Sequence, residues 1–197
     1  MLNDEVRLDH RIICDVVAPN SRVLDLGCGD GSLMLLLATH NNARVQGIEV
    51  SDDKIYECVE KGASVFHGDL DIGLSEYPDK SFDYIILNQS LQEVIKAEYV
   101  LNEALRVGQK VIIGFSNFAY YKARLDVFFG GKVPVTESLP NQWYQTPNLH
   151  FLSIRDFEDY CSHKKLKVLN RYYLGEDKLV HFMPNLFALN AIFVISK

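Results

Sequence analysis

The stretch LDLGCGDG, residues 24–31, decides the fold class of this chain. Gly27, Gly29 and Gly31 stand at every second position, directly after an apolar run that contains one acid, Asp25. Glycines this close together indicate backbone that turns tightly or that a ligand approaches closely. In open α/β sheets the ligand lies beyond the carboxyl ends of the strands, beside the first strand, and that is where this turn is expected.

Apolar runs of strand length alternate with helical patterns after this turn. The expected strands are 22–27, 43–50, 64–70, 82–89 and 110–117, and the expected helices are 32–40, 51–62, 97–108 and 118–131. Ser51 is expected as a helix N-cap and Gly62 as a helix stop. Strands that are apolar throughout are covered on both faces, so the pattern predicts a mainly parallel sheet with right-handed crossovers.

The C-terminal part breaks the alternation. A helix is expected over 154–165, where Ser153 and Asp156 have the spacing of a capping box. Two strands follow at 166–174 and 186–196, joined by eleven residues without a helical pattern. So short a link makes the two strands antiparallel. The chain is therefore expected to be an α/β protein, with a mainly parallel seven-stranded sheet that ends in an antiparallel hairpin.

One segment, 132–151, fits neither strands nor helices. It contains three prolines and the only tryptophan of the chain, Trp143. A structureless loop of this length is typical of a lid or a binding loop. Trp143 and Tyr144, with Tyr120 and Tyr121 before them, suit either a substrate pocket or a partner surface, and the sequence does not choose between the two.

Composition narrows the class of protein. The 197 residues suggest a single domain over 1–197, and the formal net charge of −6 argues against a nucleic-acid partner. The four cysteines form no CxxC pair, so no metal site is expected, and a reduced, cytoplasmic protein is favoured. No signal-peptide pattern and no run of eighteen apolar residues occurs, so no membrane association is expected.

The glycine spacing and the strand ends indicate the ligand. Ser32 stands where the nicotinamide fingerprint GxGxxG would have its third glycine, and no GKS or GKT of a P-loop follows. Glu49 is placed to accept hydrogen bonds from a ribose diol, Asp69 from an adenine amine, and Asn88 to face the cleft. The glycine spacing therefore favours a ligand without a pyrophosphate. A nicotinamide-dependent oxidoreductase remains the weaker alternative for the class of protein.

Four stretches, VLDLGCGDG, GIEVS, HGDL and FDYIIL, together resemble the class I S-adenosylmethionine-dependent methyltransferases, whose fold is a Rossmann-like sandwich. The resemblance implies that the glycine backbone carries the methionine part of the cofactor, Glu49 the ribose and Asp69 the adenine amine. The cofactor-binding residues expected for S-adenosylmethionine or S-adenosylhomocysteine are Asp25, Gly27, Cys28, Gly29, Gly31, Glu49, Val50, Asp69, Leu70 and Asn88.

A narrower resemblance covers nearly the whole chain. The stretches SRVLDLGCGDGSL, GDLDIGLSEYPDKSFDYIILNQSLQEV and GGKVPVTESLPNQWYQTPNLHFLSIRDFEDYC are similar to those of the methionine biosynthesis protein MetW family. The resemblance implies a place in methionine biosynthesis beside homoserine O-acyltransferase as a partner. It also implies that the loop 132–151 belongs to the family pattern.

Two functions remain open at this point. The first is methyl transfer to a small molecule, which needs mainly proximity and orientation, so the lack of an obvious catalytic dyad does not count against it. The second is a non-catalytic, S-adenosylmethionine-binding subunit that activates or regulates the acyltransferase. Asn88 is followed by Gln89 and not by the Pro-Pro-aromatic run of methyltransferases that act on nucleic-acid amines, which again disfavours nucleic acid.

Several side chains have two interpretations each. Asp25 either holds the glycine loop through backbone N–H groups or contacts the ligand amine through water. Gln89 and Gln92 either read a substrate or are exposed loop residues. His150 is a weak candidate for a general base, against a histidine that ties down the loop. Arg7 either closes over the ligand carboxylate or is a surface arginine. Cys28 is expected to pack under the ligand rather than to act as a nucleophile.

Overall fold

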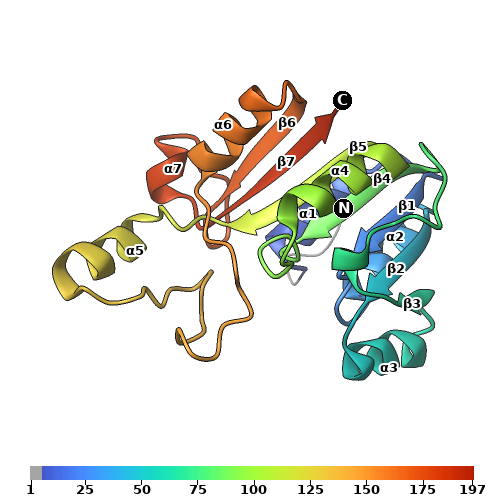
Figure 1. Ribbon diagram of the computed structural model, residues 1–197, viewed down its shortest axis with the longest axis horizontal. Coiled ribbons are helices and arrows are strands. Elements are labelled where there is room, and N and C mark those ends of the chain that lie inside the picture. The colour runs from blue at the N-terminus through green and yellow to red at the C-terminus, as the bar shows by residue number, and fades with distance from the viewer. Residues whose placement is uncertain (1–5) are drawn as a thin grey trace.

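The computed structural model describes residues 6–197 and contains a seven-stranded sheet between helices, with strand order β3-β2-β1-β4-β5-β7-β6 (Figure 1). The strands are β1 (Arg22–Leu26), β2 (Arg44–Glu49), β3 (Val65–His67), β4 (Phe82–Asn88), β5 (Gly108–Ser116), β6 (Lys167–Leu174) and β7 (Asn190–Ser196). The helices are α1 (Leu8–Val16), α2 (Ser32–His40), α3 (Asp52–Glu60), η1 (Leu70–Ile72), α4 (Ala97–Val107), α5 (Tyr121–Leu125), η2 (Asp126–Gly130), α6 (Ile154–His163) and α7 (Pro184–Phe187). The first five residues of the expected domain lie outside the described part.

The pairing of the strands confirms the predicted fold class. Strands β3, β2, β1, β4 and β5 pair in parallel, and β7 pairs antiparallel with both β5 and β6. Parallel pairing brings the carboxyl ends of five strands to one edge of the sheet. The candidate residues that follow these strands are therefore gathered along that edge.

The two faces of the sheet follow from the alternation of side chains along each strand. In β4, Tyr84 and Ile86 belong to the core under α1 and α2, whereas Ile85 and Leu87 belong to the core under α4 and α6. All four side chains are at most 5% exposed. Burial on both faces is the reason why the strand reads as a continuous apolar run.

Some boundaries differ from the sequence predictions. No helix was expected where α1 lies, and the strand expected over 64–70 ends at His67 and is followed by η1. The short helix α7 lies in the link that shows no helical pattern. The turn after β3 is local, because the Asp69 side chain caps η1 by accepting a hydrogen bond from the Asp71 N–H. Such a side-chain cap competes with continued strand pairing.

The helix caps were predicted with mixed success. Ser153 and Asp156 form the expected capping box at the start of α6. Ser51 occupies the N-cap position of α3, but its side chain makes no capping hydrogen bond. The Ser51 N–H instead donates to the Glu49 carboxylate, which takes over the role of holding this turn.

The segment that starts at α5 leaves the body of the molecule. Figure 1 shows α5 and the loop after it extending away from the sheet. The expected helix 118–131 begins only at Tyr121 and widens into a π-helical turn, η2. The loop returns to the sheet edge where the N–H groups of Leu149 and His150 donate to the main-chain oxygen of Gln92, at 2.8 and 3.1 Å. Among the described residues, no helix is long and apolar enough to cross a membrane.

Candidate functional site

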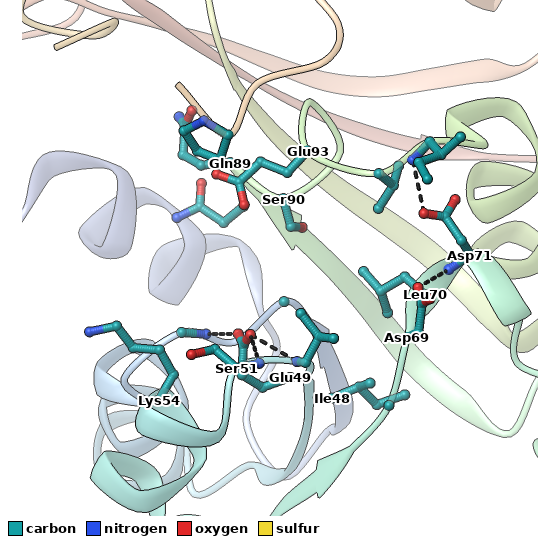
Figure 2. A pocket seen from close by; sticks show the side chains of 18 of the residues that line it. Ile48, Glu49, Ser51, Lys54, Asp69, Leu70, Asp71, Gln89, Ser90 and Glu93 are labelled. Atoms are coloured by element: carbon teal, nitrogen blue, oxygen red, sulfur yellow. Dashed lines mark hydrogen bonds between the residues drawn. The ribbon is translucent and has the colours of Figure 1, made fainter. Parts of the chain in front are cut away.

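A cleft of about 650 Å³ opens at the carboxyl ends of β1 to β4 (Figure 2). The predicted cofactor residues that line it are Gly27, Gly29, Glu49, Val50, Asp69, Leu70 and Asn88. Asp25 and Cys28 line a smaller cavity of about 170 Å³, which shares Gly27 and Gly29 with the cleft. Gly31 lines neither cavity. The structure thus gathers nine of the ten predicted cofactor residues around two adjoining cavities.

The three glycines of the loop serve different purposes. Gly27 and Gly31 have φ angles of +75° and +74°, and a Cβ atom there would lie 2.5 Å from the Ser90 Cβ and 2.9 Å from the Cys58 Sγ. These two positions exclude side chains by backbone conformation and by packing. A Cβ atom on Gly29 would meet nothing within 4 Å. Gly29 is therefore the glycine whose backbone is open to a ligand.

Glu49 holds the glycine loop in place. Its Oε2 accepts a hydrogen bond from the Gly29 N–H at 2.9 Å, and its Oε1 accepts from the N–H groups of Val50 and Ser51 at 2.9 and 3.0 Å (Figure 2). A carboxylate has about four acceptor positions. Three backbone donors therefore orient Glu49 and leave Oε2 able to accept one more hydrogen bond, from the cleft side.

Asp25 does not hold the loop, so that interpretation was wrong. No N–H group of residues 6–197 donates a hydrogen bond to its carboxyl, because the N–H groups of Gly27 and Cys28 donate to the Ile48 carbonyl. Asp25 is only 2% exposed. Burial, together with the charge of Glu49, raises the pKa of Asp25 to about 7. The end of β1, just before the loop, therefore carries a buried carboxyl whose pKa is raised to about 7 and which has unused acceptor capacity.

Cys28 packs as the sequence suggested. Its side chain is 8% exposed and forms a small cluster with Met34 and Cys58 under the loop. Burial raises the pKa of the Cys28 thiol above its usual range. Because the thiolate is the nucleophilic form, this environment disfavours a reactive cysteine.

Asp69 and Asp71 have separate roles. Asp69 lines the cleft, and one of its oxygens accepts from the Asp71 N–H at 2.8 Å. Both oxygens of Asp71 accept from backbone, one from Ile95 N–H at 2.9 Å and the other from Lys96 N–H at 2.6 Å. Asp71 therefore fixes the loop after β4, and Asp69 keeps one oxygen available to a ligand.

Asn88 connects the end of β4 to α1. Its Nδ2 donates to an Asp9 oxygen at 2.9 Å, and that same oxygen pairs with the Arg7 guanidinium at 2.6 Å. Its Oδ1 is buried, has no hydrogen-bond donor among residues 6–197, and lies where a Cβ on Gly114 would come within 2.2 Å. Asn88 lines the cleft, but its amide nitrogen is engaged in the hydrogen bond to Asp9 of α1.

Arg7 and His10 both line the smaller cavity beside Asp25. Burial lowers the pKa of His10, so its neutral form is favoured at pH 7. The sequence prediction named Arg7 but missed His10, three residues further along the chain. The available signal was the spacing of three residues between Arg7, the N-cap of α1, and His10 in its first turn, which brings the two to the same side of the helix start.

Gln92 supports the loop from below, so both of its interpretations were wrong. Its side chain is 1% exposed, which excludes an exposed loop residue, and it does not line the cleft. Its Oε1 accepts a hydrogen bond from the Ser116 N–H at 2.9 Å. Its main-chain oxygen accepts hydrogen bonds from the N–H groups of Leu149 and His150. Gln92 thus joins the end of β5 to the end of the 132–151 loop.

Gln89 does lie in the cleft. Its φ angle of +68° is uncommon for a residue with a side chain, and its Oε1 accepts from the Ser116 hydroxyl at 3.0 Å. It lines both the cleft and the smaller cavity. Strained backbone of this kind concentrates at functional sites.

His150, Trp143 and Tyr144 lie outside the cleft. His150 lines a separate cavity of about 410 Å³ between α4 and α6, with its Nε2 buried and without a hydrogen-bond partner among residues 6–197. Trp143 and Tyr144 are 69% and 65% exposed and line neither cavity. Tyr120, by contrast, is 6% exposed and belongs to the core. The end of the loop reaches the cleft through Pro147 and Leu149 instead.

Two charged residues of the cleft escaped the sequence reasoning. Lys54 and Glu93 both line it. Lys54 lies outside every stretch quoted for a resemblance, and Glu93 lies inside the stretch 68–94 but had no role assigned to it. Partial burial and the charge of Glu49 raise the pKa of Glu93. Within the described part of the chain, no group of three or more histidine, cysteine, aspartate or glutamate side chains is arranged to hold a metal ion.

Comparisons with known proteins indicate the family and the fold. The model of the family described as methionine biosynthesis protein MetW matches residues 7–195. The bifunctional methionine biosynthesis protein MetXA/MetW of Rhodopirellula baltica is 35% identical over 163 residues, which are 78% of this chain and 26% of that protein. The chain therefore spans about a quarter of that relative's length.

Solved structures of low sequence identity share the fold. A SAM-dependent methyltransferase from Archaeoglobus fulgidus superposes with a TM-score of 0.67 at 15% identity, over 97% of this chain and 91% of that one. The [4+2]-cyclase SpnF superposes with a TM-score of 0.70 at 17% identity, over 100% of this chain and 85% of that one. Since the two are described by different reactions, the shared fold does not by itself fix the chemistry.

Proposed function

The chain belongs to the family of the methionine biosynthesis protein MetW, and on this premise we propose that it binds S-adenosylmethionine and transfers the methyl group to a small molecule. The observation that carries the proposal is the cleft in which Gly29, Glu49 and Asp69 meet. Its volume of about 650 Å³ is in the range of sites for ligands of this size. A ligand without phosphate suits a loop that lacks the nicotinamide spacing.

Different residues of the chain would contact the adenine, the ribose and the amino-acid tail of the cofactor. Asp69 keeps one oxygen for the adenine amine, and Glu49 keeps one acceptor position for a ribose hydroxyl. Asp25 and Arg7, at the smaller cavity, offer opposite charges to an ammonium and a carboxylate. When bound, S-adenosylmethionine supplies an electrophilic methyl group for in-line displacement. Gln89, at the junction of the two cavities, is positioned to orient the acceptor.

Calorimetric titration tests the proposal. S-adenosylmethionine and S-adenosylhomocysteine are both expected to bind, because the contacts above involve the adenosine and the amino-acid tail that the two share. NADH is expected not to bind, since this chain lacks the GxGxxG loop that would bind its pyrophosphate. Binding of NADH without binding of S-adenosylhomocysteine would reverse the assignment. Formation of S-adenosylhomocysteine in a metabolite extract then tests methyl transfer itself.

One observation favours a second function, a partner subunit that regulates homoserine O-acyltransferase. The most exposed aromatic side chains of the extended segment, Phe128, Phe129, Trp143 and Tyr144, are 65–80% exposed, and none of them lines the cleft. Exposed aromatic side chains of this kind are typical anchors of protein interfaces. The relative whose name joins MetXA and MetW in one chain supports a partner of this kind.

Trp143→Ala separates the two functions. If the segment is an interface, the variant should bind purified homoserine O-acyltransferase at least tenfold more weakly, since a central tryptophan is typical of a binding hot spot. Its affinity for S-adenosylhomocysteine should stay unchanged. Tyr56→Ala is the matched control, because Tyr56 on α3 is also 69% exposed. Equal binding of the two variants and the wild type to the acyltransferase would argue against this interface.

A further inference from the structure

Four carboxylates line the cleft, and three of them are held by groups of the protein. Glu49 accepts three backbone N–H groups, and Asp71 accepts two. Asp69 accepts one, from Asp71 N–H. Lys54 is the cation of the cleft lining, and its Nζ donates a hydrogen bond to the Glu57 carboxylate at 2.9 Å. These contacts account for the orientation of every charged side chain of the cleft except one.

The exception is Glu93. Its backbone N–H closes a turn by donating to the Ser90 carbonyl at 3.0 Å, but no donor among residues 6–197 forms a hydrogen bond to its carboxylate. Its side chain is open to solvent on one side, yet neighbouring atoms and the charge of Glu49 raise its pKa. A carboxylate with an unfavourable charge environment and no donor gains most from a cation brought by a ligand.

The position of Glu93 indicates which part of a ligand it would meet. Figure 2 shows Glu93, Gln89 and Ser90 on one wall of the cleft and Glu49 and Ser51 on the opposite wall, with Asp69 and Leu70 to one side. The strand order β3-β2-β1-β4 places Asp69, Glu49, the glycine loop and Gln89 in sequence along the sheet edge. A ligand with adenine at Asp69 and ribose at Glu49 therefore continues toward the glycine loop under the wall that carries Glu93.

We propose that Glu93 is a specificity-determining residue that attracts a positive charge at the sulfur position of the bound cofactor. It thereby makes the cleft prefer the sulfonium form, S-adenosylmethionine, over the neutral thioether, S-adenosylhomocysteine. This inference rests on the proposed function and deepens it. The two ligands share the adenosine and the amino-acid tail, so the residues that hold those parts do not distinguish them.

Charge selectivity of this kind has a consequence for either function. A methyltransferase with it releases its product more readily than it releases its substrate. A regulatory subunit with it responds to the methylated cofactor and not to the spent one. The selectivity comes from a single attraction across a partly desolvated cleft, where Coulomb interactions are stronger than in bulk water.

The test compares Glu93→Gln with the wild type in titrations with S-adenosylmethionine, S-adenosylhomocysteine and sinefungin, which carries an amine in place of the methylated sulfur. The variant should bind S-adenosylmethionine and sinefungin about tenfold more weakly, as expected for one partly screened charge pair. Its affinity for S-adenosylhomocysteine should not change. Glu60→Gln on α3, an exposed carboxylate outside the cleft lining, controls for the change in net charge.

A second measurement does not need the variant to fold. In the wild type, the ratio of the affinities for S-adenosylmethionine and S-adenosylhomocysteine should fall as salt rises, because salt screens the attraction. Equal losses for both ligands in Glu93→Gln, an unchanged affinity for S-adenosylmethionine, or a ratio that ignores salt would overturn the role of Glu93 alone. Failure of the wild type to bind any of the three ligands would overturn the proposed function as well.

Discussion

The variant Asp25→Asn is expected to gain stability over the wild type as pH rises, although it changes a residue of the proposed site. Asp25 is 2% exposed, has no hydrogen-bond donor among residues 6–197, and has a pKa raised to about 7 by burial and by Glu49. Above that pH the wild type must keep an unpaired charge inside the protein, which is costly. Asparagine has nearly the same shape and no charge.

The direction of the pH dependence follows from linkage. In the unfolded chain an aspartate titrates near pH 4, so between about pH 4 and pH 7 the folded wild type holds a proton that the unfolded chain has lost. Stability therefore falls as pH rises through this window, and the full cost is present above pH 7. Between pH 5 and pH 8 the advantage of Asp25→Asn should grow by roughly 2–3 kcal/mol.

Denaturant unfolding of both proteins at pH 5, 6.5 and 8 measures this difference. Asp53→Asn, which changes an exposed aspartate of α3, is the control and should show no such growth. The same Asp25→Asn variant should bind S-adenosylhomocysteine more weakly at pH 8, because the ligand ammonium loses its counter-charge. A constant stability difference across the three pH values would mean that Asp25 is already ionised in the folded protein at pH 5.

The variant Glu49→Ala is expected to weaken the binding of S-adenosylhomocysteine by about 1–3 kcal/mol, the range for losing charge-assisted hydrogen bonds. Two losses combine. The ribose loses its acceptor, and the N–H groups of Gly29, Val50 and Ser51 lose the carboxylate that fixes the loop. The affinity of Glu49→Gln should fall between those of the wild type and Glu49→Ala, because its amide keeps one accepting oxygen.

Adenosine and S-adenosylhomocysteine titrations measure the effect, with Glu60→Ala as a control on the exposed face of α3. A ribose contact predicts that both ligands lose affinity, since both carry the ribose, and the loosened loop adds a further loss for S-adenosylhomocysteine. If Glu49→Ala binds both ligands as the wild type does, the ribose assignment is wrong. If only S-adenosylhomocysteine loses affinity, Glu49 acts through the loop and not on the ribose.

The fold could be predicted from the sequence because its signals are local. Continuous apolar strands, glycine stops and the short link before the last strand were enough for the sheet and its antiparallel end. The cleft residues Glu49 and Asp69 were found for the same reason, as each ends or follows its own strand. Parallel strands then bring such residues together wherever the connections run.

The roles that were missed or misread depend on contacts between distant parts of the chain. One of the two interpretations of Asp25 had it hold the loop, but the loop N–H groups donate to Ile48 and Glu49, twenty or more residues away. Gln92 reads as a loop residue, and only the return of the chain at Leu149 buries it. Glu93 lies in a stretch that resembles the family, but nothing in its sequence position shows that it faces the cleft or that burial and the charge of Glu49 raise its pKa.

The attachment of the extended segment at Gln92 has a thermodynamic consequence. Leu149 lines the cleft, and its N–H and that of His150 bind the main-chain oxygen of Gln92, the residue next to Glu93. A partner that fixes this segment and a ligand that fills the cleft therefore act on the same few backbone atoms. Linkage requires reciprocity, so whatever factor the partner contributes to ligand affinity, the ligand returns to the partner.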